Sequence, residues 1–129
     1  MAVLFIASAC ATQDATTPTD APPDQAPEVV GSGFTVSQEN AIESAQNYLS
    51  TQAFSESGLI EQLEFEGYSK DDASFAVSHI EVDWNEQAAR SAANYLDTMP
   101  FSRSGLIEQL EFEGYTHSQA IYGVDQTGL

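Results

Sequence analysis

The residues of this chain that could carry chemistry are two histidines and a large excess of carboxylates. His79 and His117 are the only histidines, and neither has a cysteine close to it in the sequence. A catalytic or metal site needs several such groups that converge on one point, whereas the glutamates of the segment 59–66 point in different directions on a helical wheel. No calcium-loop pattern is present either. We therefore predict a protein that is not an enzyme, with no metal or other cofactor and no small-molecule substrate.

Two phenylalanines surrounded by glutamates favour a binding function instead. A twelve-residue block of sequence occurs twice, and Phe65 of the first copy and Phe112 of the second lie off the apolar stripe of a predicted helix. An aromatic ring beside carboxylates is typical of a protein interface. One interpretation is two equivalent docking faces for a basic, helical partner, formed by Glu61, Glu64, Phe65, Glu108, Glu111 and Phe112. The other is that each ring packs on the third helix of its own repeat or on the other repeat.

The net charge narrows the choice of partner. The chain carries 20 Asp and Glu residues against Lys70, Arg90 and Arg103, which gives a formal charge of −17 at pH 7. Nucleic-acid binding depends on Lys and Arg side chains that displace counterions, and anionic lipid surfaces attract the same basic residues. The sequence therefore predicts no nucleic-acid binding and no electrostatic attachment to a membrane, and it favours a basic or helical protein partner.

Cys10 is the single cysteine, so an intrachain disulfide is impossible. An apolar run at residues 2–7 leads into Ser8 and Ala9, and this arrangement resembles a bacterial lipobox, with residues 1–9 as signal peptide and Cys10 as the acylated mature N-terminus. The run is far shorter than the ~20 residues that span a bilayer. Because no Lys or Arg precedes it, we expect the natural chain to begin further upstream. The alternative is a chance apolar terminus with an idle cysteine.

The segment that follows the cysteine has the composition of a tether. Residues 11–33 contain four of the five prolines, no aromatic residue and almost no large apolar side chain. Such a segment cannot bury enough surface to offset the entropy that ordering would cost. We therefore predict that residues 10–35 form a lipidated, disordered spacer that holds the rest of the chain away from the membrane.

The remainder of the chain is a tandem duplication with an offset of 47 residues. The block Ser57–Tyr68 returns without change as Ser104–Tyr115. We place repeat 1 at residues 36–81 and repeat 2 at residues 82–129. Apolar residues recur at helical spacing, which predicts an all-α fold of three short helices per repeat, with the last two arranged like a helix-turn-helix.

Polar residues and glycines predict the helix boundaries. Ser55 and Ser102 are suited to cap the second helix of each repeat, and Gly67 and Gly114 to end it in a left-handed conformation. Third helices are expected to begin at positions 69 and 116.

We expect Ser37 to open the first helix of repeat 1 and Asp83, in a capping box with Glu86, to open that of repeat 2. A unit of about 45 residues is small for an independent core, so we expect the two repeats to pack on each other. Trp84 would be buried at their junction, or, as the alternative, half-exposed on the surface.

Three stretches carry a resemblance to a known family: AFSESGLIEQLEFEGYS, VDWNEQAARSAANYLD and FSRSGLIEQLEFEGYT. They resemble the repeats of the host cell surface-exposed lipoproteins, the Ltp-type superinfection-exclusion family, over residues 38–124. Members of that family are small, all-helical lipoproteins with tandem repeats, some of them encoded by prophages of Gram-positive bacteria. Where a role is known, the product sits outside the membrane and stops another phage from delivering its DNA.

The resemblance implies a lipid-anchored protein on the outer face of the cytoplasmic membrane, with a phage tail or DNA-entry component as its partner. The alternative is an envelope-associated structural or interaction lipoprotein without a phage role. A helix-turn-helix shape by itself would suggest DNA binding, but the middle helices carry glutamates where recognition helices carry basic side chains.

Overall fold

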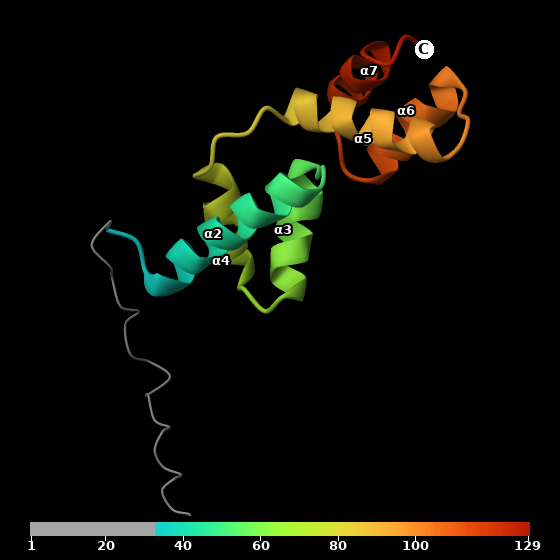
Figure 1. The fold of residues 1–129 in the computed structure, drawn as a ribbon. Coiled ribbons are helices and arrows are strands. Elements are labelled where there is room, and N and C mark those ends of the chain that lie inside the picture. Colours follow the sequence, from blue (N-terminus) through green and yellow to red (C-terminus); the bar gives the residue numbers. More distant parts are fainter. Residues whose placement is uncertain (1–32) are drawn as a thin grey trace, which may run out of the picture.

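The computed structural model describes residues 33–129. The predicted signal peptide, Cys10 and the spacer up to residue 32 lie outside the described residues. The described part is all-α, and its helices are α2 (Val36–Thr51), α3 (Glu56–Phe65), α4 (Lys70–Ser78), α5 (Trp84–Thr98), α6 (Arg103–Phe112) and α7 (His117–Asp125) (Figure 1). The first three form repeat 1 and the last three form repeat 2, as predicted.

The second and third helices of each repeat begin at the predicted residues. The Ser55 and Ser102 side chains accept hydrogen bonds from the backbone of Gly58 and Gly105 at 2.9 and 3.0 Å. Position 69 caps α4, and position 116 caps α7. Local polar signals therefore set these boundaries.

The second helices end at the predicted glycines. Gly67 has a φ of +111° and Gly114 a φ of +109°, a region that a residue with a Cβ avoids. The Tyr68 amide then donates to the Leu63 carbonyl at 3.2 Å, which closes the helix end in a Schellman arrangement. The chain can therefore turn sharply into the third helix.

The start of α2 differs from the prediction. Thr35, not Ser37, is the N-cap, because Thr35 and Gln38 form a reciprocal capping box. Ser37 lies inside the first turn, and its hydroxyl donates to Asp72 at 2.6 Å. Asp83 caps α5 as predicted and accepts from the amides of Asn85 and Glu86, but the expected return bond from the Glu86 side chain is not formed at this helix start.

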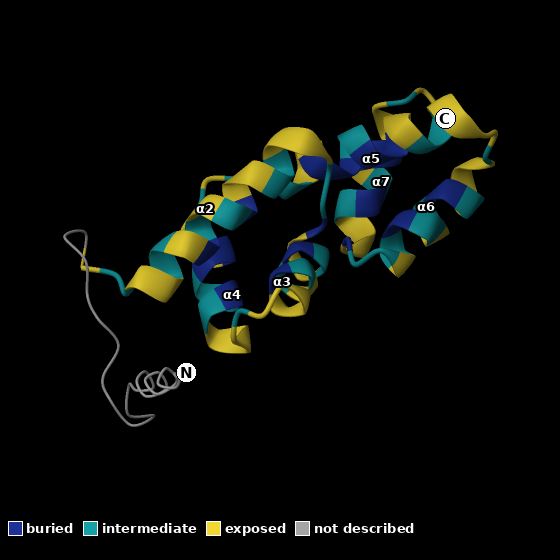
Figure 2. Ribbon diagram, turned by 60° about the horizontal axis from the view of Figure 1, so that its bottom comes forward, coloured by how far each residue is buried: buried dark blue, intermediate teal, exposed yellow. Residues whose placement is uncertain are grey.

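Each repeat has its own core, and the buried faces of its helices turn inward (Figure 2). Alanines of the first and third helices pack against two leucines of the second, so the helices approach closely. The fully buried residues are Ala41, Ala45, Leu59, Leu63, Ala73 and Ala76 in repeat 1, and Ala88, Ala92, Leu106, Leu110, Ala120 and Val124 in repeat 2. The two clusters are separate, but the repeats do pack on each other, as expected, because Trp84 of α5 lies against the core of repeat 1.

An extended segment between α4 and α5 connects the repeats (Figure 1), and polar contacts also join them. The Ser55 hydroxyl donates to the Glu113 carbonyl at 2.6 Å, and the Arg90 guanidinium donates to the Leu49 carbonyl at 3.3 Å. Trp84 packs against the core of repeat 1, so its predicted place at the junction is confirmed, but it is partly exposed and not fully buried.

Candidate partner-binding site

Phe65 and Phe112 are the most exposed large apolar side chains of the described chain. Each is 86% exposed. Each is also the last residue of its helix, and the glycine turn that follows leads the chain away from the ring. The interpretation that these rings pack inside the fold is therefore wrong, and both are available to a partner.

The four glutamates of the predicted docking faces lie in different surroundings. Glu61, Glu64 and Glu108 are exposed, whereas Glu111 is partly buried and its carboxylate contacts the His117 imidazole. His117 is a surface residue in the first turn of α7, as expected. The two faces, although identical in sequence, therefore differ in their surroundings.

A tyrosine, a glutamate and a glutamine form the same network in both repeats. The Tyr48 hydroxyl donates to the Glu66 carboxylate and accepts from the Gln62 amide at 3.1 Å. The Tyr95 hydroxyl does the same with Glu113 and Gln109, again with 3.1 Å to the amide. These glutamates tie the end of the second helix to the first helix in each repeat.

A small cavity beside each of these networks also occurs twice. In repeat 1 it measures about 290 Å³ and is lined by Ser44, Asn47, Tyr48, Thr51 and Glu66. In repeat 2 the five equivalent residues line a cavity of about 290 Å³, and two residues of repeat 1, Gln52 and Ala53, complete its wall. The second copy is therefore built from both repeats.

A further cavity of about 330 Å³ lies across the repeat junction. It shares Gln52, Ala53 and Glu113 with the cavity just described, and its remaining lining residues are Phe54, Ser55, Gly58, Glu61 and Phe112. The structure thus brings Glu61 of repeat 1 together with Phe112 of repeat 2. The other predicted site residues, Glu64, Phe65, Glu108 and Glu111, do not line this cavity.

Burial changes the titration of two groups near this junction. It raises the pKa of the Glu113 carboxyl above its usual value. It also raises the pKa of Tyr115 to about 12, against the opposing effects of the hydrogen bond to Ser91 and the Arg90 charge. The Tyr115 hydroxyl is held by Ser91 at 2.9 Å and by the Gln87 carbonyl at 3.1 Å, so its role is structural.

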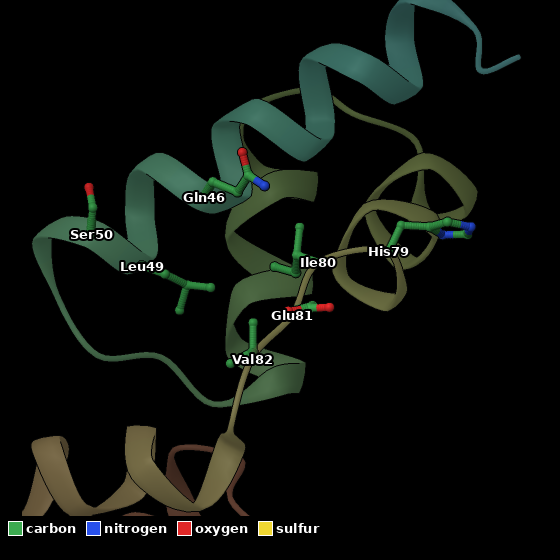
Figure 3. A pocket seen from close by; sticks show the side chains of 7 residues that line it. All are labelled: Gln46, Leu49, Ser50, His79, Ile80, Glu81 and Val82. Atoms are coloured by element: carbon green, nitrogen blue, oxygen red, sulfur yellow. The ribbon is translucent and has the colours of Figure 1, made fainter. Parts of the chain in front are cut away.

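The cavity of about 540 Å³ between α2 and the segment 79–82 has no arrangement suited to catalysis (Figure 3). The His79 imidazole points away from Leu49 and Ile80 and stacks on Phe75 with 3.9 Å between the ring centroids. Its Nδ1 lies 2.8 Å from the Phe75 carbonyl oxygen. His79 is therefore occupied in closing the end of α4.

The described part of the chain lacks both metal-binding groups of side chains and membrane-spanning helices. Residues 33–129 contain no group of three or more His, Cys, Asp or Glu side chains placed to hold a metal ion. None of the helices in this range is long and apolar enough to cross a bilayer.

Sequence reasoning missed the contribution of Gln52, Ala53 and Glu113. The pattern shows which face of a helix is polar, but it does not show how one repeat is placed against the next. One signal could have been used. The second helices of both repeats begin at a serine cap and end at a glycine turn, so the start of one can contact the end of the other.

Fold and sequence together place the chain among small all-α proteins made of tandem three-helix repeats. The sequence profile of the host cell surface-exposed lipoproteins matches residues 36–80 and 83–126. The chain therefore belongs to the host cell surface-exposed lipoprotein family, as the repeats predicted, and this is not a known family of enzymes.

A solved structure supports the same assignment. The chain is similar to Ltp, a superinfection exclusion protein from the Streptococcus thermophilus temperate phage TP-J34, with 33% sequence identity and a TM-score of 0.67. The match covers 71% of this chain and 96% of the Ltp chain. The comparison with curated protein sequences gave no match.

Proposed function

We propose that this protein is a membrane-anchored lipoprotein on the bacterial cell surface that excludes superinfecting phages by blocking the entry of their DNA. The observation that carries the proposal is the likeness to Ltp, a superinfection exclusion protein, over 96% of the Ltp chain. Acylation of Cys10 would hold the chain on the outer face of the cytoplasmic membrane, since two or three acyl chains anchor firmly. The outer face is where incoming phage DNA must pass.

To block DNA entry, the protein needs only to bind a component of the phage while it is held at the membrane surface. Phe65 and Phe112 expose apolar rings to solvent, and exposed glutamates flank them, Glu61 and Glu64 in repeat 1 and Glu108 in repeat 2. Such a surface suits a basic protein partner, and we propose a phage tail or DNA-entry component. The anchor raises the effective concentration of the binding surface at the membrane, so contacts of modest affinity suffice.

The test is expression of the chain in a phage-susceptible Gram-positive host. We expect normal adsorption of phage, little phage DNA inside the cells and a strong fall in plating efficiency. The matched control is Cys10→Ala, which should abolish exclusion while the protein is still made. Full sensitivity to every phage tested, with the protein detected on the surface, would contradict the proposal and favour a different envelope function.

A second test addresses the binding surface. Reversal of charge at Glu61, Glu64, Glu108 and Glu111 to Lys should abolish exclusion and leave the helical circular dichroism spectrum unchanged. Unchanged exclusion by this variant would show that these carboxylates are not the docking surface.

A further inference from the structure

The two exposed phenylalanines have identical sequence on their N-terminal side and different surroundings. The twelve residues 57–68 are the same as the twelve residues 104–115. Phe112 lines the cavity of about 330 Å³ at the junction, together with residues of repeat 1. The corresponding residues around Phe65 would have to come from a unit placed before repeat 1. Phe65 and Phe112 therefore lie in identical local sequence, but only Phe112 lines a cavity formed by both repeats.

Two neighbouring cavities lie at the junction, and we call them together the junction groove. One lies beside Tyr95 and the other beside Phe112, and they share Gln52, Ala53 and Glu113. The repeat-1 copy of the first cavity has no such extension, because its lining residues all belong to α2 and the end of α3. The groove is thus a feature of the joined repeats and of neither repeat alone.

The charge of the groove selects a cationic occupant. Its titratable lining residues are Glu61, Glu113 and Tyr95, and no Lys, Arg or His lines either cavity. Glu61 is exposed, so its carboxylate is available to a partner. Arg90, at the same junction, is directed to the Leu49 carbonyl and to Gln87.

We propose that the junction groove is a single composite site that binds an arginine side chain of the partner polypeptide, with its guanidinium on the Phe112 ring and paired with the Glu61 carboxylate. A guanidinium stacks on aromatic faces and also forms two parallel hydrogen bonds with a carboxylate, which fits a ring and an acid placed on one groove. The inference rests on the proposed function and deepens it. It replaces two equivalent docking faces with one principal site that needs both repeats.

The chain supplies its own matched controls. Phe112→Ala and Glu61→Gln alter the groove, whereas Phe65→Ala and Glu108→Gln make the same changes at the equivalent positions outside it. All four side chains are exposed, so the variants should fold, and thermal unfolding checks this. The probe is a blocked Gly-Arg-Gly peptide, and its control is the same peptide with neutral citrulline in place of arginine.

The measurement is a titration of the full chain followed by amide chemical shifts in NMR. We expect saturable shifts near Gly58, Glu61 and Phe112, with an affinity that falls about fivefold or more in Phe112→Ala and Glu61→Gln. The variants Phe65→Ala and Glu108→Gln should bind the Gly-Arg-Gly peptide with wild-type affinity, because neither residue lines the groove. Equal losses in the members of a matched pair, equal binding of the citrulline peptide, or no saturable shift would each overturn the composite site.

Phage exclusion separates this inference from the function on which it rests. If wild-type protein excludes phage and Phe65→Ala weakens exclusion as much as Phe112→Ala does, the composite site is wrong and the function stands. If wild-type protein excludes no phage, the function fails, and the peptide titration still decides whether the groove binds arginine.

Discussion

Repeat 1 and repeat 2 share a sequence scaffold and differ in how tightly that scaffold is packed. The third helix of repeat 2 carries Gly123 where repeat 1 has Ala76. A Cβ at Gly123 would lie 2.6 Å from the backbone carbonyl carbon of Ala88, so α5 and α7 approach more closely than a side chain permits. Tyr115 is 3% exposed, whereas its equivalent Tyr68 is only half-buried. Duplicated sequence thus gives equal helices but unequal interiors.

The two repeats also differ in the side-chain contacts outside their cores. Repeat 1 holds an aromatic cluster in which Phe34 meets Phe75 edge-on at 5.0 Å and His79 stacks on Phe75. Repeat 2 has an ion pair instead, between Arg103 and Asp125 at 2.6 Å. The comparison teaches that the identical block preserves the helix and its glycine turn, while residues outside it make each repeat specific.

The most severe test of two separate cores is to open a cavity in one of them. Leu110→Ala should cost repeat 2 about 2–5 kcal/mol of unfolding free energy, because Leu110 is fully buried. Repeat 1 should lose much less, and Leu63→Ala should give the reverse pattern. Residue-specific hydrogen exchange measures both repeats in one sample. Equal loss of protection throughout residues 33–129 would mean that the two cores unfold as one.

The close helix crossing of repeat 2 can be broken at its glycine. Gly123→Ala should destabilise repeat 2 by about 3 kcal/mol, since the new methyl group meets the backbone of Ala88 and not a movable side chain. In the matched variant Ala76→Gly, repeat 1 should lose about 2 kcal/mol, about half through the flexibility of glycine and about half through loss of a buried methyl group. Thermal unfolding followed by circular dichroism gives both values, and a neutral Gly123→Ala would show that the crossing can open without cost.

The buried tyrosine of repeat 2 predicts a dependence on pH. Burial raises the pKa of Tyr115 from about 10 to about 12, so the folded state favours the neutral hydroxyl. The resulting stability is complete below about pH 10 and is lost as pH rises through about 12, by on the order of 2 kcal/mol. Denaturant unfolding between pH 9 and pH 12 should show this fall in wild type and a smaller one in Tyr115→Phe. The same fall in both proteins would assign it to other groups.

The serine caps differ because one of them also joins the repeats. Ser102→Ala removes a cap that is worth about 1 kcal/mol. Ser55→Ala removes an equivalent cap and also the 2.6 Å bond to the Glu113 carbonyl, which adds about 1 kcal/mol. Equilibrium unfolding should therefore rank Ser55→Ala below Ser102→Ala in stability. Equal values would mean that the contact between the repeats contributes nothing.

The smallest effect is expected at the ion pair of repeat 2. Arg103 and Asp125 have side chains that are 44% and 49% exposed, and pairs of this kind contribute about 0–1 kcal/mol. Arg103→Ala should lower stability by less than any change above, and 1 M salt should reduce the difference further. A loss that persists at high salt would point instead to the bond between Arg103 and the Leu129 carbonyl.

The features that could be predicted from the sequence are those with local causes. Serine at a helix start and glycine at a helix end act within four residues, so the caps at Ser55 and Ser102 and the turns at Gly67 and Gly114 are where the pattern places them. The start of α2 could also have been predicted correctly. Thr35 and Gln38 have the spacing of a capping box, whereas Ser37 has no Glu or Gln three residues later.

The features that could not be predicted depend on how distant parts meet. Helical periodicity places Phe65 and Phe112 off the apolar stripe, but it cannot tell an interface from a contact with another helix, and their exposure decides this. Likewise, the separate cores and the pairing of Glu61 with Phe112 follow from the placement of one repeat on the other. That placement rests on a few polar contacts that leave no periodic signal.

The bond between Ser55 and the Glu113 carbonyl has a consequence for growth of the molecule. It joins the start of one second helix to the end of the other, so the contact is heterologous and relates the repeats as successive steps along a line. The residues equivalent to this pair at the two outer ends, Ser102 and Glu66, are exposed. Repeats related in this way form an open array and do not close into a ring. A further repeat added by gene duplication could form the same serine-to-carbonyl contact with the outer repeat. The chain could therefore lengthen by whole repeats without other changes to its surface residues.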